Sequence, residues 1–376
     1  VQTCALPILI HNEMRKYGIK LVLGYTVEGF KEKDNGVEVL LKDNPSLQAD
    51  MVVLAIGVTP DTALAKEAGL ELGIKGSIVV NDRMETSVPD IYAAGDAVQV
   101  KHYVTGDDAL ISLAGPANKQ GRIIADNICG GDSRYLGSQG SSVIKVFDIT
   151  AATTGINETN AKKSGLEVDT VILSPMSHAG YYPGGKVMTM KVVFEKDTYR
   201  LLGAQIIGYE GVDKRIDVLA TAIHAGLKAT QLKDLDLAYA PPYSSAKDPV
   251  NMAGFMIDNI AKGTLKQWHL EDMDKISKDK SVVLLDVRTV GEFNRGHMDG
   301  FKNIPVDELR ERINEIEKGK PVYLICQSGL RSYIASRILE GNGYETYNFS
   351  GGFRFYDVVV NDRVLIERSY VCGMDY

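Results

Sequence analysis

The chain has 376 residues, of which 44% are hydrophobic, and this length allows two or three domains that each bury a core. Its net charge of −7 gives no support for nucleic-acid binding, and no apolar run is long enough to cross a bilayer. Four cysteines are too few to frame a secreted scaffold of this size, and no secretory signal is recognised. We therefore expect a cytoplasmic protein without nucleic-acid or membrane partners.

The first eight residues, VQTCALPI, match the translation of a sequencing-library adapter. We therefore expect residues 1–8, with Cys4, to be non-native, and the native sequence to resume near Leu9 inside a gene already under way. The alternative is a native segment cut at an arbitrary point.

Helical and strand patterns alternate up to residue 57, as is typical of an α/β domain. The segment ILIHNEMRKYG has helical spacing and ends at Gly18. Three segments predict strands, with turns at 34–36 and 44–45 between them. The strand segments are IKLVLGYTVEGF (19–30), GVEVLLKD (36–43) and ADMVVLAIG (49–57).

The stretch SVPDIYAAGDAV combines an apolar run with Gly95 and Asp96. A Gly-Asp at the end of a strand lets the backbone approach a cofactor and sets a carboxylate against a sugar hydroxyl. Such a strand usually follows a G-x-G-x-x-G turn, which the sequence before Ser87 lacks. Next, the segment AGPANKQGRIIADNICGG predicts a helix that ends on glycines.

The segments AIGVTPDT, ETSVPDIYAAGDAV and LAGPANKQGRIIADNI together resemble the flavin-dependent pyridine nucleotide–disulfide oxidoreductases. The resemblance implies FAD and NADH or NADPH as cofactors. It makes residues 1–57 the remnant of an NAD(P)H-binding domain and 58–141 the C-terminal part of an FAD-binding domain, both Rossmann-like and incomplete.

Four residues of this part are implied to bind the flavin: Gly95, Asp96, Ala117 and Asn118. By resemblance, Asp96 holds the ribityl chain, although a turn or helix N-cap carboxylate is the alternative. The helix that starts near Pro116 would aim its first amides, at Ala117 and Asn118, toward the flavin ring and favour its anionic reduced form. Asn118 would also contact substrate, and its alternative role is an N-cap.

Residues 142–263 resemble the dimerisation domain of the same family, which implies a homodimer. Their order includes the segment GAQIIG and a helix with apolar residues at 216, 219, 220 and 223. The segment YAPPYSSAKDPV resembles the branch that holds coenzyme A disulfide reductases, NADH oxidases and NADH peroxidases. In its coenzyme A enzymes tyrosines act as acids, which implies that role for Tyr181 and Tyr239, with Tyr239 reaching the partner's flavin, and a coenzyme A phosphate contact for Lys247. The alternatives are interface tyrosines with satisfied hydroxyls and a solvated lysine.

Residues 268–368 alternate strands and helices, which predicts a separate parallel α/β domain. The predicted strands are SVVLLDVR, PVYLIC and YETYNFSGG, and the predicted helices are VDELRERINEIEKG and SYIASRILEGNG. The segments DVRTVGEFNRGHMDGFKNIP and CQSGLRS make this unit resemble the single-domain rhodaneses along its full length.

The segment CQSGLRS places Cys326 where a strand ends and a helix begins. Backbone amides of Gln327, Ser328, Gly329, Leu330 and Arg331 would converge on its sulfur, and the helix dipole and the Arg331 charge would favour the thiolate. Such a thiolate attacks a sulfane sulfur and holds it as a persulfide, in a loop whose four intervening residues suit one sulfur atom. The alternative for Cys326 is a buried structural thiol.

Three further predictions concern the residues around this loop and the other thiols. Asp286 and Arg288 are expected to brace the loop. Cys129 is expected in a helix core, and Cys372 as an ordinary thiol.

The resemblance as a whole implies an FAD-dependent NAD(P)H:coenzyme A disulfide, persulfide or polysulfide reductase fused to a persulfide-carrying rhodanese. No cysteine matches the redox cysteine of such reductases, so we expect the reductase half of this chain to be inactive. Two alternatives stay open: an NADH oxidase or peroxidase, and a sulfur-carrier rhodanese on a flavoprotein dimer platform.

Overall fold

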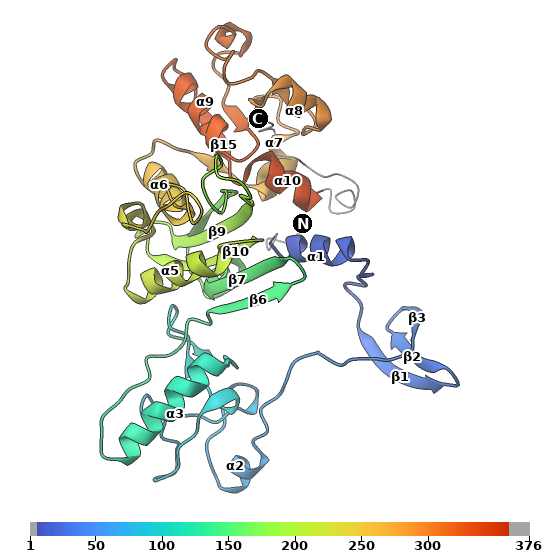
Figure 1. The fold of residues 1–376 in the computed structure, drawn as a ribbon, viewed down its shortest axis with the longest axis vertical. Helices are drawn as coiled ribbons and strands as arrows, with labels where there is room; N and C mark the ends of the chain where they lie inside the picture. The colour runs from blue at the N-terminus through green and yellow to red at the C-terminus, as the bar shows by residue number, and fades with distance from the viewer. Residues whose placement is uncertain (1–5, 361–376) are drawn as a thin grey trace. The chain divides into compact units, whose positions relative to one another are not determined.

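The computed structural model describes residues 6–360. The chain divides into two compact units, one formed by residues up to 16, 102–106 and from 139 onward, the other by 17–101 and 107–138 (Figure 1). Cys4 and Cys372, and the predictions made for them, lie outside the described residues, as does the end of the predicted C-terminal domain. None of the helices within 6–360 is long and apolar enough to cross a membrane.

In the second unit, a three-stranded antiparallel meander comes first. Its strands are β1 (Val27–Lys33), β2 (Gly36–Leu41) and β3 (Asn44–Ala49). Gly36 has a φ of 128°, and a Cβ there would meet the carbonyl oxygen of Ala49 at 2.4 Å, so this tight turn requires glycine. The second turn, predicted at 44–45, is wrong, because the chain reverses just before Asn44, where β3 begins.

The strand predicted at 49–57 is also wrong, because no regular structure follows Ala49 until α2 (Ala63–Glu67). Its apolar side chains lie open to solvent, with Met51 76% and Ile56 90% exposed. A strand exists only through backbone pairing, and no neighbouring strand pairs with this segment among residues 6–360. The strand predicted at 19–30 likewise starts only at Val27.

The rest of the second unit is built from short elements around one long helix. They are η1 (Ile74–Gly76), η2 (Gly95–Ala97), β4 (Val100–Lys101), β5 (Asp108–Ala109) and α3 (Ala114–Ile128). The buried core is small, with Met84, Val98 and Val100 at its centre. Cys129 follows α3 and is exposed, so its predicted core position is wrong.

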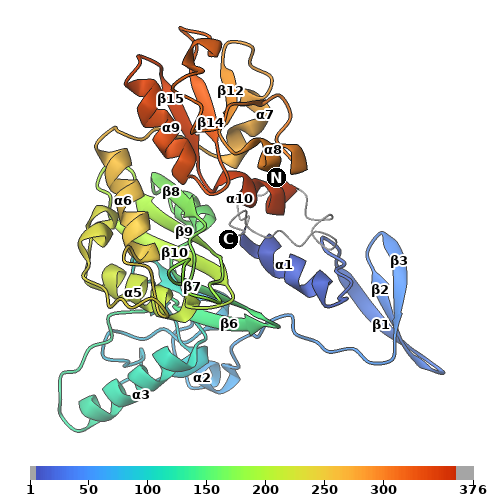
Figure 2. The ribbon, with the colours of Figure 1, turned by 45° about the horizontal axis from the view of Figure 1, so that its top comes forward.

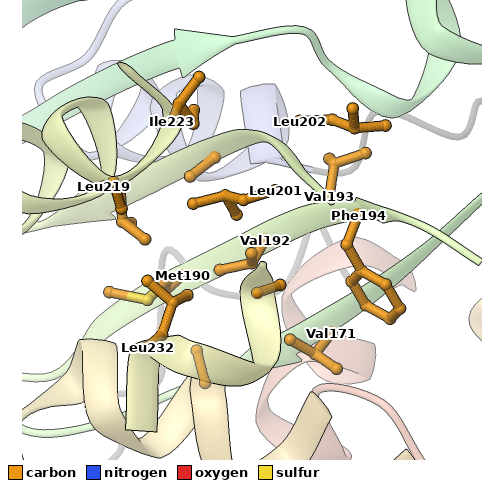
Figure 3. Packing of buried hydrophobic residues seen from close by; sticks show 14 of the residues in the cluster. Val171, Met190, Val192, Val193, Phe194, Leu201, Leu202, Leu219, Ile223 and Leu232 are labelled. Atoms are coloured by element: carbon orange, nitrogen blue, oxygen red, sulfur yellow. The ribbon is translucent and has the colours of Figure 1, made fainter. Parts of the chain in front are cut away.

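The predicted dimerisation domain contains a five-stranded antiparallel sheet in the order β6-β7-β10-β9-β8. Its strands are β6 (Ser142–Val146), β7 (Ile149–Gly155), β8 (Val168–Leu173), β9 (Met188–Glu195) and β10 (Leu201–Gly208). Its helices are α4 (Glu158–Lys163), α5 (Val212–His224), η3 (Ala229–Asp234) and α6 (Pro249–Ala261). Apolar side chains of β9 and β10 pack against Leu219 and Ile223 of α5 (Figure 3).

The predicted rhodanese domain contains a five-stranded parallel sheet in the order β11-β15-β14-β12-β13. Its strands are β11 (Gln267–Trp268), β12 (Val283–Asp286), β13 (Lys302–Asn303), β14 (Val322–Ile325) and β15 (Thr346–Phe349). Its helices are η4 (Leu270–Asp272), α7 (Met273–Ile276), α8 (Val290–Arg295), η5 (Ile313–Glu315), α9 (Leu330–Glu340) and α10 (Gly352–Val360). The long helix α9 contacts β14 and β15 (Figure 2), and α1 (Leu6–Lys16) contacts α10.

The helix predicted over 306–319 is wrong, because only η5 is helical there. Successive turns replace it, with the amides of Glu308 and Leu309 donating to carbonyls three residues earlier. The amide of Val306 instead donates to Val287, which ties the start of this segment to the sheet. The hydrogen bond from Val306 to Val287 and the packing of Leu309 into the core thus override a local helical pattern.

The two sheets of the first unit are joined through β8, an edge strand, and the chain around β11. Gln267 donates to both carboxylate oxygens of Asp169, at 3.2 and 3.1 Å, and His269 Nε2 lies 3.1 Å from Asp169 Oδ1. The amide of Ile172 donates to Ser350 Oγ at 3.0 Å. A polar junction therefore joins the predicted rhodanese domain to the predicted dimerisation domain.

Candidate functional site

The sulfur of Cys326 lies at the base of a short loop between β14 and α9. Its residue is only 1% exposed. The amide of Gly329 donates to Sγ at 3.1 Å, and the hydroxyl of Ser332 lies within hydrogen-bonding distance of Sγ, at 3.2 Å. The Gly329 amide therefore donates directly to the sulfur, and the Ser332 hydroxyl is shared between the sulfur and the carbonyl of Gly329, 3.1 Å away. The amide was predicted as one of a converging set, whereas Ser332 was missed, although it ends the CQSGLRS segment.

Gly352 packs closely against the backbone of this loop. Gly352 has a φ of 70°, and a Cβ there would lie 2.7 Å from the carbonyl oxygen of Gln327 and from the amide nitrogen of Ser328. The amide of Phe353 donates to the carbonyl of Cys326 at 2.7 Å. The start of α10 therefore packs against the backbone of the loop, and the amides of Phe353 and Arg354 bind the carbonyls of Cys326 and Gln327.

Asp286 and Arg288 form a buried ion pair beside the loop, 0% and 1% exposed. Arg288 also donates to the carbonyl of Gly296 at 2.8 Å and to the side-chain oxygen of Gln327 at 3.4 Å. Its guanidinium lies 3.8 Å from the ring centroid of Phe353. These contacts join three segments around the loop and give the pair the geometry of a brace.

Arg331 forms a bidentate pair with Glu292, with both N–O distances at 2.7 Å. Burial alone would raise the pKa of Glu292, but the bonds from Arg331 and Thr289 outweigh it and lower this pKa to about 2. The same pair raises the pKa of Arg331. Glu292 was missed in the sequence, although Thr289 and Glu292 form a capping box, a pattern that the letters TVGE display.

Tyr181 and Tyr239 lie far apart in the sequence, yet their hydroxyl oxygens are 2.6 Å apart. Both phenols are accessible, 74% and 44% exposed. The hydrogen bond to Tyr181 raises the pKa of Tyr239 above the ordinary tyrosine value. Lys247 is exposed, with Nζ 5.0 Å from the ring centroid of Phe255. The structure thus brings the two tyrosines together and places Lys247 on the loop that follows Tyr239.

A cavity of about 510 Å³ opens beside Tyr239. Three segments line it, at 177–178, 210–215 and 238–243. It contains one accessible cation, Lys214, and one carboxylate, Glu210, within a wall that is largely apolar. Such a cavity has room for a small organic group next to the tyrosine pair.

The flavin-binding residues predicted in the other unit surround the start of α3. Gly95 has a φ of 85°, its amide donates to Gln120 Oε1 at 2.7 Å, and a Cβ there would lie 4.0 Å from the Cβ of Ala117. Gln120 is 1% exposed and was missed in the sequence. Asp96 lies exposed within η2 and Asn118 lies exposed within α3.

These positions exclude a helix N-cap role for Asn118 and for Asp96, whereas the alternative of a turn carboxylate stays open for Asp96, which lies within η2. The helix begins at Ala114 rather than near Pro116 and its N-cap is Leu113, so Asn118 is not an N-cap; its side chain donates back to the carbonyl of Ala114 at 3.1 Å. Asp96 is not a helix N-cap either, because Ala94 precedes η2. No side chain caps the first amides of α3, and these amides, with the open backbone at Gly95, fit the closing part of a flavin site.

No cluster of metal-binding side chains occurs within residues 6–360.

Comparison with protein families identifies three successive domains. Residues 8–121 match the pyridine nucleotide-disulphide oxidoreductase family, residues 141–249 match the dimerisation domain of that family, and residues 269–356 match the rhodanese-like domain. The α/β class with these added domains, predicted from the sequence, is confirmed.

Two solved structures resemble nearly the whole chain. The reduced CoADR-RHD of Bacillus anthracis is 45% identical with a TM-score of 0.92, and the match covers 96% of this chain and 64% of that one. A NAD-dependent persulfide reductase from A. fulgidus is 40% identical with a TM-score of 0.85, covering 93% of this chain and 64% of that one.

Among curated proteins, the NAD(P)H sulfur oxidoreductase (CoA-dependent) of Pyrococcus abyssi is 37% identical over 241 residues, which is 64% of this chain and 54% of that protein. The coenzyme A disulfide reductase of Staphylococcus aureus strain JH9 is 36% identical over 251 residues, 66% of this chain and 55% of that protein. The chain spans about half the length of the curated relatives it matches.

Proposed function

Because the chain belongs to the pyridine nucleotide-disulphide oxidoreductases and carries a rhodanese-like domain, we propose that it serves the NAD(P)H-dependent reduction of coenzyme A disulfides, persulfides or polysulfides. Its similarity to a coenzyme A disulfide reductase and to a persulfide reductase supports this substrate class. The observation that carries the sulfur part is the buried Cys326 sulfur, which the Gly329 amide and the Ser332 hydroxyl approach as donors.

Sulfur transfer at Cys326 follows from this geometry. The thiolate attacks the outer sulfur of a persulfide or polysulfide, the S–S bond of the donor breaks, and the donor leaves as a thiolate. The loop amides and Ser332 stabilise the anionic sulfur before and after transfer. Coenzyme A, as a thiolate, then attacks the outer sulfur of the Cys326 persulfide, which forms coenzyme A persulfide and restores the Cys326 thiolate.

The tyrosine pair supplies the proton for the reductive step. Reduction of a coenzyme A persulfide consumes two electrons and one proton and yields coenzyme A and hydrosulfide. Tyr239, protonated at neutral pH and bonded to Tyr181, donates to the leaving sulfur, and Lys247 pairs with a phosphate of coenzyme A. FAD, when bound, relays the electron pair from NADH or NADPH. Gly95, Asp96, Ala117 and Asn118 would hold it, with Asn118 also near the substrate.

The same proposal includes the oligomeric state, the location and the activity of this chain alone. The protein acts as a homodimer in which Tyr239 reaches the partner's flavin, and it works in the cytoplasm. This chain alone binds FAD weakly and does not reduce disulfides, because the described flavin-side residues supply only the closing part of the site.

A sulfur-carrier role is the second candidate, favoured by the Cys326 site, whose loop, brace and support all come from one domain. One experiment separates these functions and the oxidase or peroxidase alternative. The chain, extended to a complete flavin domain, is assayed with coenzyme A disulfide, coenzyme A persulfide, peroxide and thiosulfate. We expect turnover of NAD(P)H with the coenzyme A substrates. Turnover with peroxide or oxygen alone would favour the oxidase, and sulfur transfer without NAD(P)H oxidation would favour the carrier.

A further inference from the structure

Arg215, on α5, is a fully buried guanidinium beneath the tyrosine pair. It is 1% exposed and forms an ion pair with Asp248, 3% exposed, at 3.0 Å. An arginine keeps its charge inside a protein, so burial is tolerated only where its donors are satisfied. Its bonding therefore constrains every segment that supplies an acceptor.

The acceptors of Arg215 come from both tyrosine loops. Nη2 donates to the carbonyl of Ser177, at 2.9 Å, on the loop that carries Tyr181. The same nitrogen donates to the carbonyl of Tyr243 at 3.2 Å and to Ser244 Oγ at 3.1 Å, on the loop that carries Tyr239.

Ser244 and Asp248 extend this network between the loops. Ser244 Oγ donates to Asp248 Oδ2 at 2.6 Å, and Asp248 caps α6 by accepting from the amide of Val250 at 3.0 Å. The amide of Ala179 donates to the carbonyl of Ser244 at 3.0 Å, which joins the two loops directly. Both loops are therefore anchored at one buried point.

Gly211 leaves the space that the guanidinium occupies. Nη1 of Arg215 donates to the Gly211 carbonyl at 3.1 Å, and a Cβ at Gly211 would lie 2.0 Å from Nη1. Gly211 has a φ of 69°, a conformation that also favours glycine. The backbone before α5 is thus shaped around Arg215.

The exposed tyrosines need such an anchor. Packing does not fix Tyr181 and Tyr239, because both phenols are open to solvent, yet their hydroxyls meet at 2.6 Å. The backbone beneath them is buried, with Ala179 5% and Ser244 0% exposed. We propose that Arg215 is a positioning residue that holds the Tyr181 and Tyr239 loops at the separation where their hydroxyls form a hydrogen bond. This inference rests on the proposed function for the proton donation that the pair performs.

The test measures the tyrosine pair itself and needs no bound cofactor. The chain is labelled with ¹³Cζ-tyrosine, the signals are assigned with Tyr181→Phe and Tyr239→Phe, and Tyr239 is titrated by NMR. Tyr181→Phe is expected to lower the pKa of Tyr239, because it removes the bond that raises it. Arg215→Lys keeps the positive charge but lacks the planar set of guanidinium donors. It is expected to lower the pKa of Tyr239 by more than half as much as Tyr181→Phe does.

Arg200→Lys is the matched control, since Arg200 lies in the same domain and donates to Val104 rather than to either loop. It should leave the Tyr239 titration unchanged. A folded Arg215→Lys protein whose Tyr239 titrates as in the parent would overturn the proposal. If Arg215→Lys does not fold, Ser244→Ala decides: a smaller shift in the same direction supports the proposal, and an unchanged titration overturns it.

The proposed function is tested separately. If the titration responds to Arg215→Lys but disulfide reduction by the extended protein survives loss of both phenols, the positioning role stands and the acid role falls.

Discussion

The surroundings of Cys326 and of Gly95 differ in how much of a site each contains. Around Cys326, strand, loop, helix, ion-pair brace and glycine support all belong to one domain, and the buried core that includes Cys326 lies within that domain. Around Gly95, the core is small, and an apolar segment earlier in the same unit, from Met51 to Val58, has no strand partner within residues 6–360.

This difference shows that the distance along the sequence between the parts of a site decides how much of the chain must fold before the site forms. A site whose groups lie within one hundred or so residues forms wherever that domain folds. A dinucleotide site combines a glycine-rich turn with a closing Gly-Asp that lies far along the chain from it, so the residues around Gly95 would supply one part of such a site.

Loss of the nucleophile should have the largest effect. Cys326→Ser is expected to abolish transfer of sulfane sulfur to cyanide or a thiol, because an alkoxide is not accessible at neutral pH and oxygen forms no persulfide. Transfer is measured with thiosulfate or polysulfide as donor. Cys129→Ser is the control, since Cys129 is exposed and remote in sequence, and it should retain parental rates. Equal activity of the Cys326→Ser protein would show that the transfer occurs elsewhere.

The tyrosine pair should come next. Replacing Tyr181 and Tyr239 together by Phe is expected to slow disulfide reduction in the extended protein by about 10²-fold, the usual contribution of a general acid. Flavin reduction by NAD(P)H should stay unchanged, which stopped-flow absorbance can follow. Tyr182→Phe, next to Tyr181 in the chain and 42% exposed, is the matched control, because Tyr182 does not line the cavity. Undiminished disulfide turnover in the double variant would remove the acid role.

The Arg331–Glu292 pair should have a smaller effect, on stability. Glu292→Gln is expected to destabilise the rhodanese domain by about 1 kcal/mol at neutral pH, since it breaks a half-buried pair that solvent partly screens. The pKa of Glu292 is depressed to about 2, so this contribution is present above the ordinary glutamate pKa and is lost as pH falls toward 2. Urea unfolding followed by the fluorescence of Trp268, the single tryptophan, measures it.

Glu315→Gln sharpens this comparison, because Glu315 also has a pKa of about 2 but is 41% exposed. Solvent screening should make its loss much less costly. Equal effects of the two substitutions would mean that burial of the Glu292 pair contributes nothing.

The smallest effect is expected at the junction of the two domains. Burial would lower the pKa of His269, but the bond to Asp169 outweighs it and raises this pKa, with Glu271 and Asp272 adding to the rise. A raised pKa means that the pair stabilises fully below pH 6.5 and that its contribution is lost as pH rises through the folded value. His269→Gln should therefore cost about 0.5–1 kcal/mol near pH 6, and the cost should fall as the pH rises above the ordinary histidine pKa. A cost that grows with pH would contradict this assignment.

The sequence identified residues that the structure brings together more reliably than it predicted the irregular segments. Cys326 and the tyrosine pair were found because short motifs carry them. Glu292, Ser332 and Arg215 were missed as partners, since their contacts cross between loops that only tertiary structure brings together. The predictions of a strand at 49–57 and of a helix at 306–319 were wrong for a related reason. A local pattern indicates only a preference for strand or helix, and strand pairing or packing in the folded protein decides which structure forms.

Mass spectrometry of the chain after treatment with a sulfane sulfur donor shows directly which cysteine is loaded with sulfur. We expect a gain of one sulfur atom on the peptide that contains Cys326, removed by a thiol acceptor and absent in Cys326→Ser. A stoichiometric gain on the peptide of Cys129 or Cys372, with none on that of Cys326, would contradict it.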